Sequence, residues 1–358
     1  MDFGICVASR PADVDYVVEA EALGYRHCWM ADSQMIWSDV YAMLALVADR
    51  TTSISIGTGV AVAGLRPAPV TAAAMATINQ LAPGRTFCGI GTGNTAMRIM
   101  GHKPMRIAEF DRYLTELGPL LRGEETVIEW HGVETPVRHL MPDHGFVSFE
   151  PPVPVYVSAF GPRSMRLAAR HGDGLITSAP PEPDTIAGIR AGIEMMGSEL
   201  GRSLTRDHFP IATLTTMVVL DDDEPIDSER ARRECGAFAI AGVHYAYDQF
   251  RQFGRRPPAH MADFWDDYVA LVEDVPADRR HQRVHLGHNC WVLPEEEQFV
   301  TAELIQRSCL VGTADQLIEW VRALDLAGLD HIVLLPPLDE KEKVIRDVAA
   351  RVMPGLVT

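Results

Sequence analysis

The segment Gly89–Asn94 (GIGTGN) has residue types that could bind a ligand. Its glycines are closely spaced and are followed by an amide side chain. Glycine lets backbone amides approach a ligand closely, and Asn94 offers a hydrogen-bond donor and an acceptor. The segment is not the dinucleotide fingerprint, which opens a helix after the first strand. It predicts a strand end that contacts a ligand, with a plain tight turn as the alternative.

A strand that runs directly into a helix forms the second segment, Ser158–Ser164 (SAFGPRS). Pro162 suits the first helical turn, because the amide that proline lacks has no helical partner there. The remaining amides and the positive end of the helix dipole favour an anion such as phosphate, and the Ser164 hydroxyl could contribute. An ordinary helix start is the alternative interpretation.

Two further positions suit a flat, phosphorylated ligand. Arg106 begins a predicted helix, where a cation opposes the helix dipole, so it is either an anion ligand or a plain surface arginine. Gly57–Val60 (GTGV) ends a β-branched stretch, and the glycines that flank Thr58 permit an unusual backbone against which a ring could lie. A plain strand end is the alternative for this segment.

The histidines do not form a metal-binding signature. Neither H-x-H nor H-E-x-x-H occurs, and His285 and His288 share an H-x-x-H spacing with no carboxylate in an obvious register. We therefore predict no metal site.

Short apolar runs alternate with amphipathic stretches along most of the chain. Eight runs predict strands: Phe3–Ser9, Arg26–Met30, Ser53–Val60, Thr86–Gly91, Val153–Ala159, Gly174–Thr177, Pro210–Leu220 and His331–Pro336. Alternation with helices implies a parallel sheet, and eight such units are the number that closes a (β/α)8 TIM barrel. A doubly wound open sheet is the alternative.

The long segment 221–307, between strands seven and eight, breaks this alternation. It is helical in pattern and rich in Phe, Tyr and Trp. Segments this long in compact domains usually carry structure of their own or a function. We expect residues 1–358 to form a single domain in which 221–307 is a helical excursion over the C-terminal mouth. Packing at the side as a dimer surface is the alternative.

Composition excludes several classes of protein. A formal net charge of −17 over 358 residues argues against a nucleic-acid surface, which requires a basic patch. No stretch is apolar enough to span a membrane, and the first residues lack the features of a signal peptide. The six scattered cysteines form no C-x-x-C pair, which indicates reduced thiols in a cytoplasmic protein.

Together these segments resemble the bacterial luciferase-like superfamily of flavin- and deazaflavin-dependent oxidoreductases. The resemblance rests on segments in order along the chain: Asp32-Ser33-Gln34, Gly57–Val60, Gln80–Arg85, Gly91–Asn94, Arg106, Ser158–Ser164 and Leu310–Thr313. It implies a β/α barrel that binds reduced flavin mononucleotide (FMN), or a deazaflavin of the F420 type, at the C-terminal mouth.

The resemblance also implies roles for particular residues. Arg106 and Ser164 match the phosphate ligands, with the Gly161 amide assisting. Thr58 and Gly59 match a strand end where the family often has a non-proline cis peptide pressed against the ring. The remaining positions expected at the mouth or on the cofactor are Ser9, Asp32, Asn94 and Ser158.

One departure concerns the proton donor. In several deazaflavin-dependent members a histidine follows the strand-two aspartate, whereas Ser33 and Gln34 follow Asp32 here. Asp32 is one catalytic candidate. The others are histidines of the excursion, because histidine suits proton transfer at neutral pH: His244, His285 and His288. We favour His288, because the neighbouring Asn289 and Trp291 could orient and shield it.

Three functions are compatible with these residues. The first is a two-component monooxygenase that takes reduced FMN from a separate flavin reductase and adds dioxygen to a small organic substrate. The second is a deazaflavin-dependent reductase or dehydrogenase, similar to methylene-tetrahydromethanopterin reductase, that transfers a hydride. The third is a flavin-binding barrel without catalysis. We expect a homodimer or higher homo-oligomer, with neither a nucleic acid nor a membrane as partner.

Overall fold

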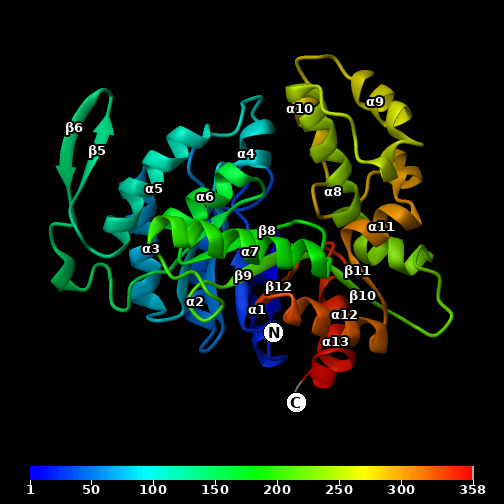
Figure 1. The fold of residues 1–358 in the computed structure, drawn as a ribbon, viewed down its shortest axis with the longest axis horizontal. Coiled ribbons are helices and arrows are strands. Elements are labelled where there is room, and N and C mark those ends of the chain that lie inside the picture. The colour runs from blue at the N-terminus through cyan, green and yellow to red at the C-terminus, as the bar shows by residue number, and fades with distance from the viewer. Residues whose placement is uncertain (357–358) are drawn as a thin grey trace.

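The computed structural model describes residues 1–356, in which eight parallel strands close into a barrel (Figure 1). The order around the barrel is β1 (Asp2–Val7), β12 (His331–Leu334), β9 (Ile211–Thr215), β8 (Gly174–Thr177), β7 (Val155–Ser158), β4 (Thr86–Gly91), β3 (Ser55–Val62) and β2 (His27–Met30). β1 pairs with β12 on one side and with β2 on the other, so the sheet has no edge. The predicted TIM barrel is confirmed, and the open-sheet alternative is wrong.

Helices surround the barrel and cover the outer faces of its strands. They are α1 (Val14–Ala22), α2 (Val40–Arg50), α3 (Ala68–Leu81), α5 (Ile107–Leu121), α6 (Pro162–His171), α7 (Pro183–Leu200), α12 (Ala314–Leu326) and α13 (Lys341–Arg351). The short helix α4 (Asn94–Arg98) instead lies at the mouth, where Thr95 and Arg98 contact the insertion. Short 3-10 turns add η1 (Pro11–Asp13), η2 (Pro142–His144) and η5 (Met353–Leu356). α5 shows why such helices form, because Phe110, Leu114, Leu117 and Leu121 recur at helical spacing and are all buried.

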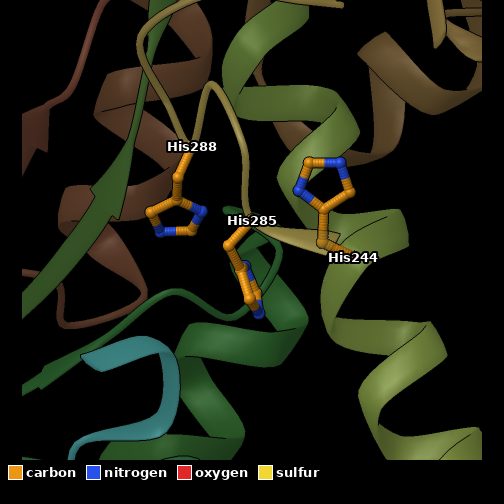
Figure 2. A group of neighbouring side chains, drawn as sticks. All are labelled: His244, His285 and His288. Atoms are coloured by element: carbon orange, nitrogen blue, oxygen red, sulfur yellow. The ribbon is translucent and has the colours of Figure 1, made fainter. Parts of the chain in front are cut away.

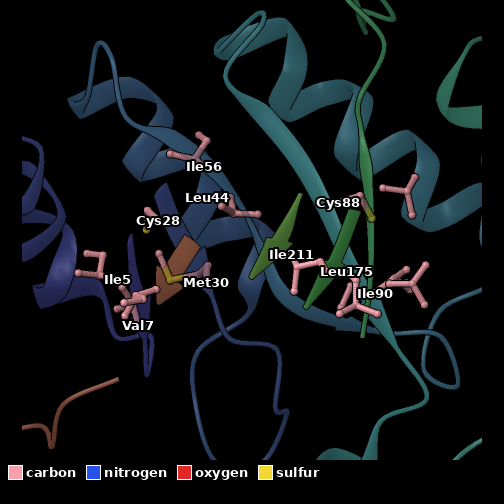
Figure 3. Close-up of a cluster of buried hydrophobic side chains, with 14 of the residues drawn as sticks. Ile5, Val7, Cys28, Met30, Leu44, Ile56, Cys88, Ile90, Leu175 and Ile211 are labelled. Carbon is pink, nitrogen blue, oxygen red and sulfur yellow. The ribbon is translucent and has the colours of Figure 1, made fainter. Parts of the chain in front are cut away.

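Alternation along each strand separates two cores. Ile5 and Val7 of β1 and Ile90 of β4 face outward into the layer beneath the helices (Figure 3). The intervening residues face inward, where Trp29 lies with its ring centroid 4.4 Å from that of Phe87. The barrel interior is therefore a packed core, which leaves the mouth as the place for a ligand.

The predicted insertion between the seventh and eighth barrel strands is confirmed. It is built from β10 (Met217–Leu220), α8 (Glu229–Phe253), η3 (Ala259–Met261), α9 (Trp265–Glu273), α10 (Arg280–Val284), η4 (Pro294–Phe299), α11 (Ala302–Ser308) and β11 (Leu310–Thr313). In Figure 1 its helices stand together on one side of the barrel. They share an apolar core of their own, which includes Tyr268, Phe299 and Leu304.

The single strand predicted over 210–220 is two strands in the structure. The carbonyl of Thr215 accepts a hydrogen bond from the amide of Leu335 (2.8 Å). The carbonyl of Thr216 instead accepts one from the amide of Leu310 (3.0 Å). The neighbouring strand therefore changes at this point, and β10 leaves the barrel to pair with β11. The continuous strand-like sequence of residues 211–220 (IATLTTMVVL) gives no sign of such a change of partner.

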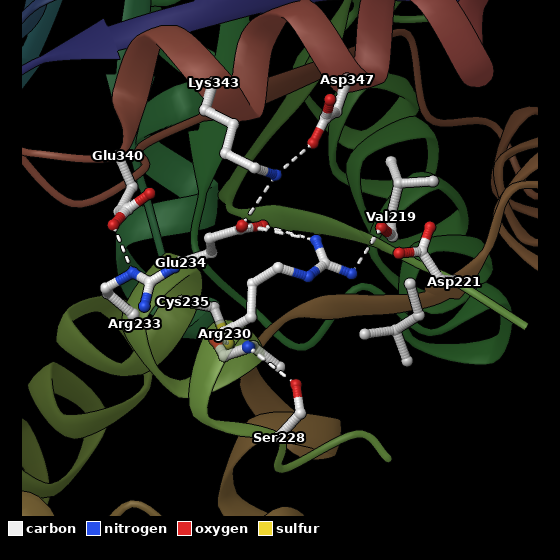
Figure 4. Close-up of polar contacts among 12 residues, drawn as sticks. Val219, Asp221, Ser228, Arg230, Arg233, Glu234, Cys235, Glu340, Lys343 and Asp347 are labelled. Atoms are coloured by element: carbon white, nitrogen blue, oxygen red, sulfur yellow. Dashed lines mark hydrogen bonds and ion pairs between the residues drawn. The ribbon is translucent and has the colours of Figure 1, made fainter. Parts of the chain in front are cut away.

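Ion pairs fasten the insertion to the barrel (Figure 4). Glu234 of α8 is 1% exposed and contacts Arg230 at 3.2 Å and Lys343 of α13 at 2.8 Å. A second pair joins Arg233 to Glu340, directly before α13. These contacts hold the first part of α8 against the last helix of the barrel.

An antiparallel hairpin, β5 (Thr126–Trp130) and β6 (Val133–Val137), was not predicted. Its two-residue turn, His131 and Gly132, has positive φ at both positions, as hairpin turns require. The sequence signal for this hairpin is short: an alternating run over 126–130, followed by the His131-Gly132 turn.

All six cysteines are buried, and none forms a disulfide within residues 1–356. In the same part of the chain, no helix has the length and apolar character needed to cross a membrane.

Candidate functional site

The carboxyl ends of three barrel strands meet in one shelf at the mouth. The peptide bond between Gly59 and Val60 is cis, and the pairing of β3 with β4 shifts register at this point. A Cβ built on Gly91 would lie 3.0 Å from a Val60 methyl group and 3.2 Å from the Cβ of Ser158. The strand ends are therefore closely packed at Gly91, where a side chain would press on Val60 and Ser158.

Two of the predicted cofactor residues have structural contacts in this shelf. Thr58 is fully buried, and its hydroxyl donates to the Gly89 carbonyl at 2.6 Å. A Cβ on Gly59 would lie 2.6 Å from the Cβ of Trp29, so glycine is needed for packing there as well. Both residues shape the strand end on which a ring could lie, and the Thr58 hydroxyl is already engaged.

The start of α6 is an open helix N-terminus, as the Ser158–Ser164 pattern suggested. The Ser164 hydroxyl accepts hydrogen bonds from the amides of Phe160 (3.1 Å) and Gly161 (3.2 Å). A Cβ built on Gly161 would meet no heavy atom of the described chain within 4 Å. Ser164 thus occupies the amides of Phe160 and Gly161, while the backbone at Gly161 borders open space. The positive dipole end of α6 at this point favours an anion such as phosphate.

Arg106 stands immediately before α5, the helix that packs beside α6. Its side chain is 83% exposed and pairs with Glu109. The guanidinium is free to reorient, so a phosphate at the neighbouring helix start would compete with Glu109 for it.

Asn94 is the first residue of α4, directly after Gly93, which has φ of 80°. Its side-chain carbonyl accepts a hydrogen bond from the Nε of Arg98 at 2.7 Å. The same Arg98 nitrogen lies 3.3 Å from a carboxylate oxygen of Asp248 on α8. The glycine-rich strand end is thereby connected to the insertion.

Asp32 lies buried beside the shelf in an ion pair. One of its oxygens accepts hydrogen bonds from Arg66 at 2.7 Å and from the Val62 amide at 3.2 Å. Burial raises the pKa of Asp32, and Arg66 opposes this shift. Ser9 is also buried, with its hydroxyl 3.3 Å from the Ser38 carbonyl. In this arrangement Asp32 fixes the end of β3; its catalytic role remains a prediction.

The three candidate histidines come together within the insertion (Figure 2). His285 Nε2 lies 3.0 Å from Asp248 Oδ2, and His244 Nε2 lies 3.3 Å from Glu296 Oε2. The His285 and His288 rings are 5.1 Å apart, although Gly287 has φ of 77° and the segment is a turn, not a helix. Burial lowers the pKa of both His285 and His288, so both are neutral at pH 7.

His288 faces the barrel. Its Nε2 atom lies 3.0 Å from the Asn289 amide nitrogen, 3.3 Å from the Tyr245 hydroxyl and 3.4 Å from the Thr95 hydroxyl. Trp291 is 50% exposed and does not shield it; the Trp37 ring, 5.8 Å away, does. Asn289 therefore orients His288 as expected, whereas the aromatic cover comes from a different part of the chain.

A cavity of about 440 Å³ opens between the barrel mouth and the insertion. Its apolar lining includes Leu214 of β9 and Phe238 of α8, while Tyr245 and Asn289 reach it from the histidine side. The rim is polar, with Arg307 and Glu182 3.2 Å apart. Sequence reasoning identified none of the rim residues, because only the fold places residue 182 beside residue 307.

This arrangement has the parts needed for redox chemistry on an organic substrate. The shelf and the start of α6 lie at the carboxyl ends of the strands, and the cavity lies between the mouth and the insertion. Small-molecule sites commonly combine an apolar cavity with a few polar groups in this way.

Comparison with known proteins agrees with this arrangement. A profile of the luciferase-like monooxygenase family matches residues 7–331. The chain is 28% identical over 355 residues to the 5,10-methylenetetrahydromethanopterin reductase of Archaeoglobus fulgidus, with 95% of this chain and 94% of that protein covered. It is 25% identical over 363 residues to the F420-dependent glucose-6-phosphate dehydrogenase of Nakamurella multipartita, with 96% and 91% covered.

Solved structures share the fold. The F420-dependent tetrahydromethanopterin reductase of Methanopyrus kandleri superposes with a TM-score of 0.72 at 18% identity over 99% of both chains. The oxygenating constituent of 3,6-diketocamphane monooxygenase from Pseudomonas putida, in complex with FMN, gives a TM-score of 0.65 at 18% identity over 100% of this chain and 99% of that one. The match to the family over most of the chain, together with the barrel and its mouth, shows that this protein is an oxidoreductase of the luciferase-like monooxygenase family.

Proposed function

We propose that the protein is an F420-dependent reductase or dehydrogenase that transfers a hydride between a deazaflavin and a small organic substrate. The observation that carries the proposal is the similarity, over nearly the whole of both chains, to relatives named as a methylenetetrahydromethanopterin reductase and as F420-dependent dehydrogenases. FMN occurs by name only among structural neighbours of low identity, which support the fold alone. This favours the hydride-transfer reading over the two-component monooxygenase and over a barrel without catalysis.

The residues at the mouth fit a phosphorylated deazaflavin. The open first turn of α6, with Gly161 and Ser164, would hold the phosphate, and Arg106 would neutralise its charge. The bulge at Gly59 would support the ring, and Asn94 would hydrogen-bond the ring or the ribityl chain. When bound, F420 supplies a two-electron carrier that gives or takes a hydride.

The chain itself would position the substrate and handle the proton. Phe238 and Leu214 provide apolar walls that exclude water, and the rim pair of Arg307 and Glu182 would select a substrate with a polar end. Tyr245 lines the cavity and lies 3.3 Å from His288 Nε2. A proton required at a carbonyl or imine would come from the Tyr245 hydroxyl, which His288 would orient. This route takes the place of direct donation by His288.

Anaerobic turnover tests the proposal. Protein mixed with oxidised F420 and a panel of small alcohols, or with reduced F420 and the matching carbonyl and imine compounds, should change the deazaflavin absorbance only when a substrate is present. Oxygen uptake with reduced FMN and no reaction with F420 under any condition would instead favour a monooxygenase. A homodimer and a cytoplasmic location remain predictions.

A further inference from the structure

Three imidazoles converge inside the insertion. His244 comes from α8, whereas His285 and His288 come from the turn that follows α10. One ring nitrogen of each residue lies within 4.8 Å of those of the other two. The His285 ring is almost perpendicular to both neighbours, at 89° and 84°, and Figure 2 shows the rings turned toward one another.

The hydrogen bonds of two of these rings fix which nitrogen carries the proton. Nε2 of His244 and Nε2 of His285 each face a carboxylate oxygen, of Glu296 and of Asp248. A carboxylate oxygen accepts a hydrogen bond from a ring N–H, so Nε2 is the donating nitrogen of His244 and of His285. The lone pair of each ring therefore resides on Nδ1.

His288 reaches the same state through its own neighbours. The Tyr245 and Thr95 hydroxyls, 3.3 and 3.4 Å from Nε2, can both accept its proton. The side-chain oxygen of Asn289 is buried without a partner in the described chain, and half a turn of the amide brings it to Nε2 as a further acceptor. The lone pair of His288 then also resides on Nδ1.

All three Nδ1 atoms are buried and lack a hydrogen-bond partner within residues 1–356. The side chains are at most 3% exposed, so bulk water does not compensate them. A single water molecule has two protons and satisfies two acceptors, not three. A cation with several coordination positions satisfies all three at once.

We propose that His244, His285 and His288 bind a divalent transition-metal ion through their Nδ1 atoms, with Zn²⁺ the best match. Imidazole suits zinc and its neighbours in the first transition row. Zn–N bonds of about 2.0–2.1 Å would draw together the ring nitrogens, which lie within 4.8 Å of one another. Carboxylates hydrogen-bonded to the other ring nitrogen are the usual outer partners of metal-bound histidine.

The sequence argued against a metal because the H-x-x-H spacing has no carboxylate in register. The fold brings a third histidine and a carboxylate to the H-x-x-H pair. His244 joins from 41 positions earlier in the chain, as its number shows, and Asp248 follows one helical turn later on α8.

A metal at this position would have a positioning role. It would hold the turn 285–290 against α8, and Asp248 would pass that constraint to Arg98, which binds Asn94 at the barrel mouth. The ion would thus fix the wall of the cavity and the loop beside the cofactor shelf. The inference does not depend on which cofactor the barrel binds.

Metal content of the full-length protein tests the inference directly. Protein purified in the presence of Zn²⁺ and then dialysed should retain one zinc ion per chain. Removal with a strong chelator should lower the Tm, and added Zn²⁺ should restore it. Co²⁺ in place of zinc should give the visible absorption of a low-coordinate nitrogen site.

Matched variants locate the ion. His244→Gln and His285→Gln should abolish the Co²⁺ spectrum and the Tm response, whereas His281→Gln, on α10 but outside the cluster, should retain both. Glu296→Gln keeps the ligands and removes one outer carboxylate, so it should weaken Zn²⁺ binding by about 10–100-fold.

Two results would overturn the inference. The first is wild-type protein that binds neither Zn²⁺ nor Co²⁺, which would make the cluster a group of packed histidines without a ligand. The second is metal binding that persists unchanged in both ligand variants. If the ligand variants do not fold, the wild-type Co²⁺ spectrum and the affinity of Glu296→Gln decide between the same outcomes.

Discussion

Tyr245 is the residue at which the cavity meets the buried histidines. It lines the cavity, and its hydroxyl lies 3.1 Å from Thr95 and 3.3 Å from His288. Burial raises the pKa of Tyr245 to about 12, so the hydroxyl keeps its proton at neutral pH. In the proposed function, this protonated hydroxyl donates to a substrate bound in the cavity.

We expect Tyr245→Phe to lower kcat by about 10²–10⁴-fold, the usual effect of losing a positioned acid or base. Cofactor affinity should change little, because Tyr245 is not among the residues proposed to bind the phosphate. Tyr247→Phe is the matched control, since Tyr247 lies on the same helix and its hydroxyl faces Glu273 at 3.4 Å. Steady-state kinetics at several pH values measures the effect; wild-type kcat in Tyr245→Phe would rule out this proton route.

Arg106→Ala should weaken cofactor binding by about tenfold or more, because a charge-assisted contact to phosphate is lost. Arg112→Ala, on the same helix and paired with Glu129, should bind as the wild type does. Fluorescence titration compares the two variants. Equal affinities would show that Arg106 is a plain surface arginine.

Sequence reasoning selected several residues of the candidate site but not their contacts. Asn94, Gly161 and Ser164 were identified because glycine, proline and serine at strand and helix ends have local physical meaning. Asp32 was expected at the mouth, yet its ion pair with Arg66 depends on how β2 and β3 lie side by side. Contacts between distant positions do not appear in local patterns.

At the scale of elements, β4 is built around glycines that let β3 bulge against it. A Cβ on Gly89 would lie 2.2 Å from the Thr58 carbonyl oxygen, which leaves no room for a methyl group. Gly161 differs, since its backbone has φ of −129° and open space in front of it. The two glycines therefore have different roles, one in packing and one in access.

Alanine substitution at these two glycines separates the roles. Gly89→Ala should lower the free energy of unfolding by about 1–3 kcal/mol, because the backbone of β3 or β4 must shift. Gly161→Ala should leave the Tm unchanged and weaken cofactor binding, because its methyl group would occupy the space for phosphate. Thermal unfolding and titration of both variants measure this; a Gly161→Ala variant with wild-type affinity would place the phosphate elsewhere.

Most elements could be predicted, because buried parallel strands and amphipathic helices have distinct periodicities. The eight barrel strands were found near their observed positions. The hairpin β5–β6 was missed because its strands are short and largely exposed, and so lack an apolar run. The separation of β10 from β9 was missed because both are buried and apolar.

At the scale of the whole molecule, closure of the barrel and the site of the insertion followed from the number and order of units. The orientation of the insertion did not, because it depends on ion pairs between the insertion and the barrel, such as that of Glu234 with Lys343. Those residues read as solvated surface charges when taken from the sequence alone. The cavity exists only because both parts are held together.

Barrel closure also sets an acid limit on stability. His331 begins β12, and its ring lies 4.3 Å from that of His27 on β2. Burial, reinforced by His27, lowers the pKa of His331 from 6.5 to about 3. Below pH 6.5 the unfolded chain therefore binds a proton at this histidine that the native state does not bind. The free energy of unfolding decreases as the pH falls from 6.5 toward 3.

We expect His331→Leu to show a shallower loss of stability over this range, by up to about 1.4 kcal/mol per pH unit. Leucine has no proton to bind, so the difference between the folded and unfolded states disappears. Denaturant unfolding at a series of pH values gives the slope, with the exposed His208→Leu as control. Identical slopes in His331→Leu and wild type would show that His331 does not limit acid stability.

The choice between deazaflavin and flavin is the central claim, and parallel titration of the wild-type protein with F420 and FMN tests it most directly. Both ligands carry a phosphate and a fluorescent tricyclic ring, so one fluorescence assay measures both under identical conditions. We expect F420 to bind at least about tenfold more tightly than FMN, a difference of about 1.4 kcal/mol. Tighter binding of FMN, or saturable binding of FMN with none of F420, would contradict the proposed function.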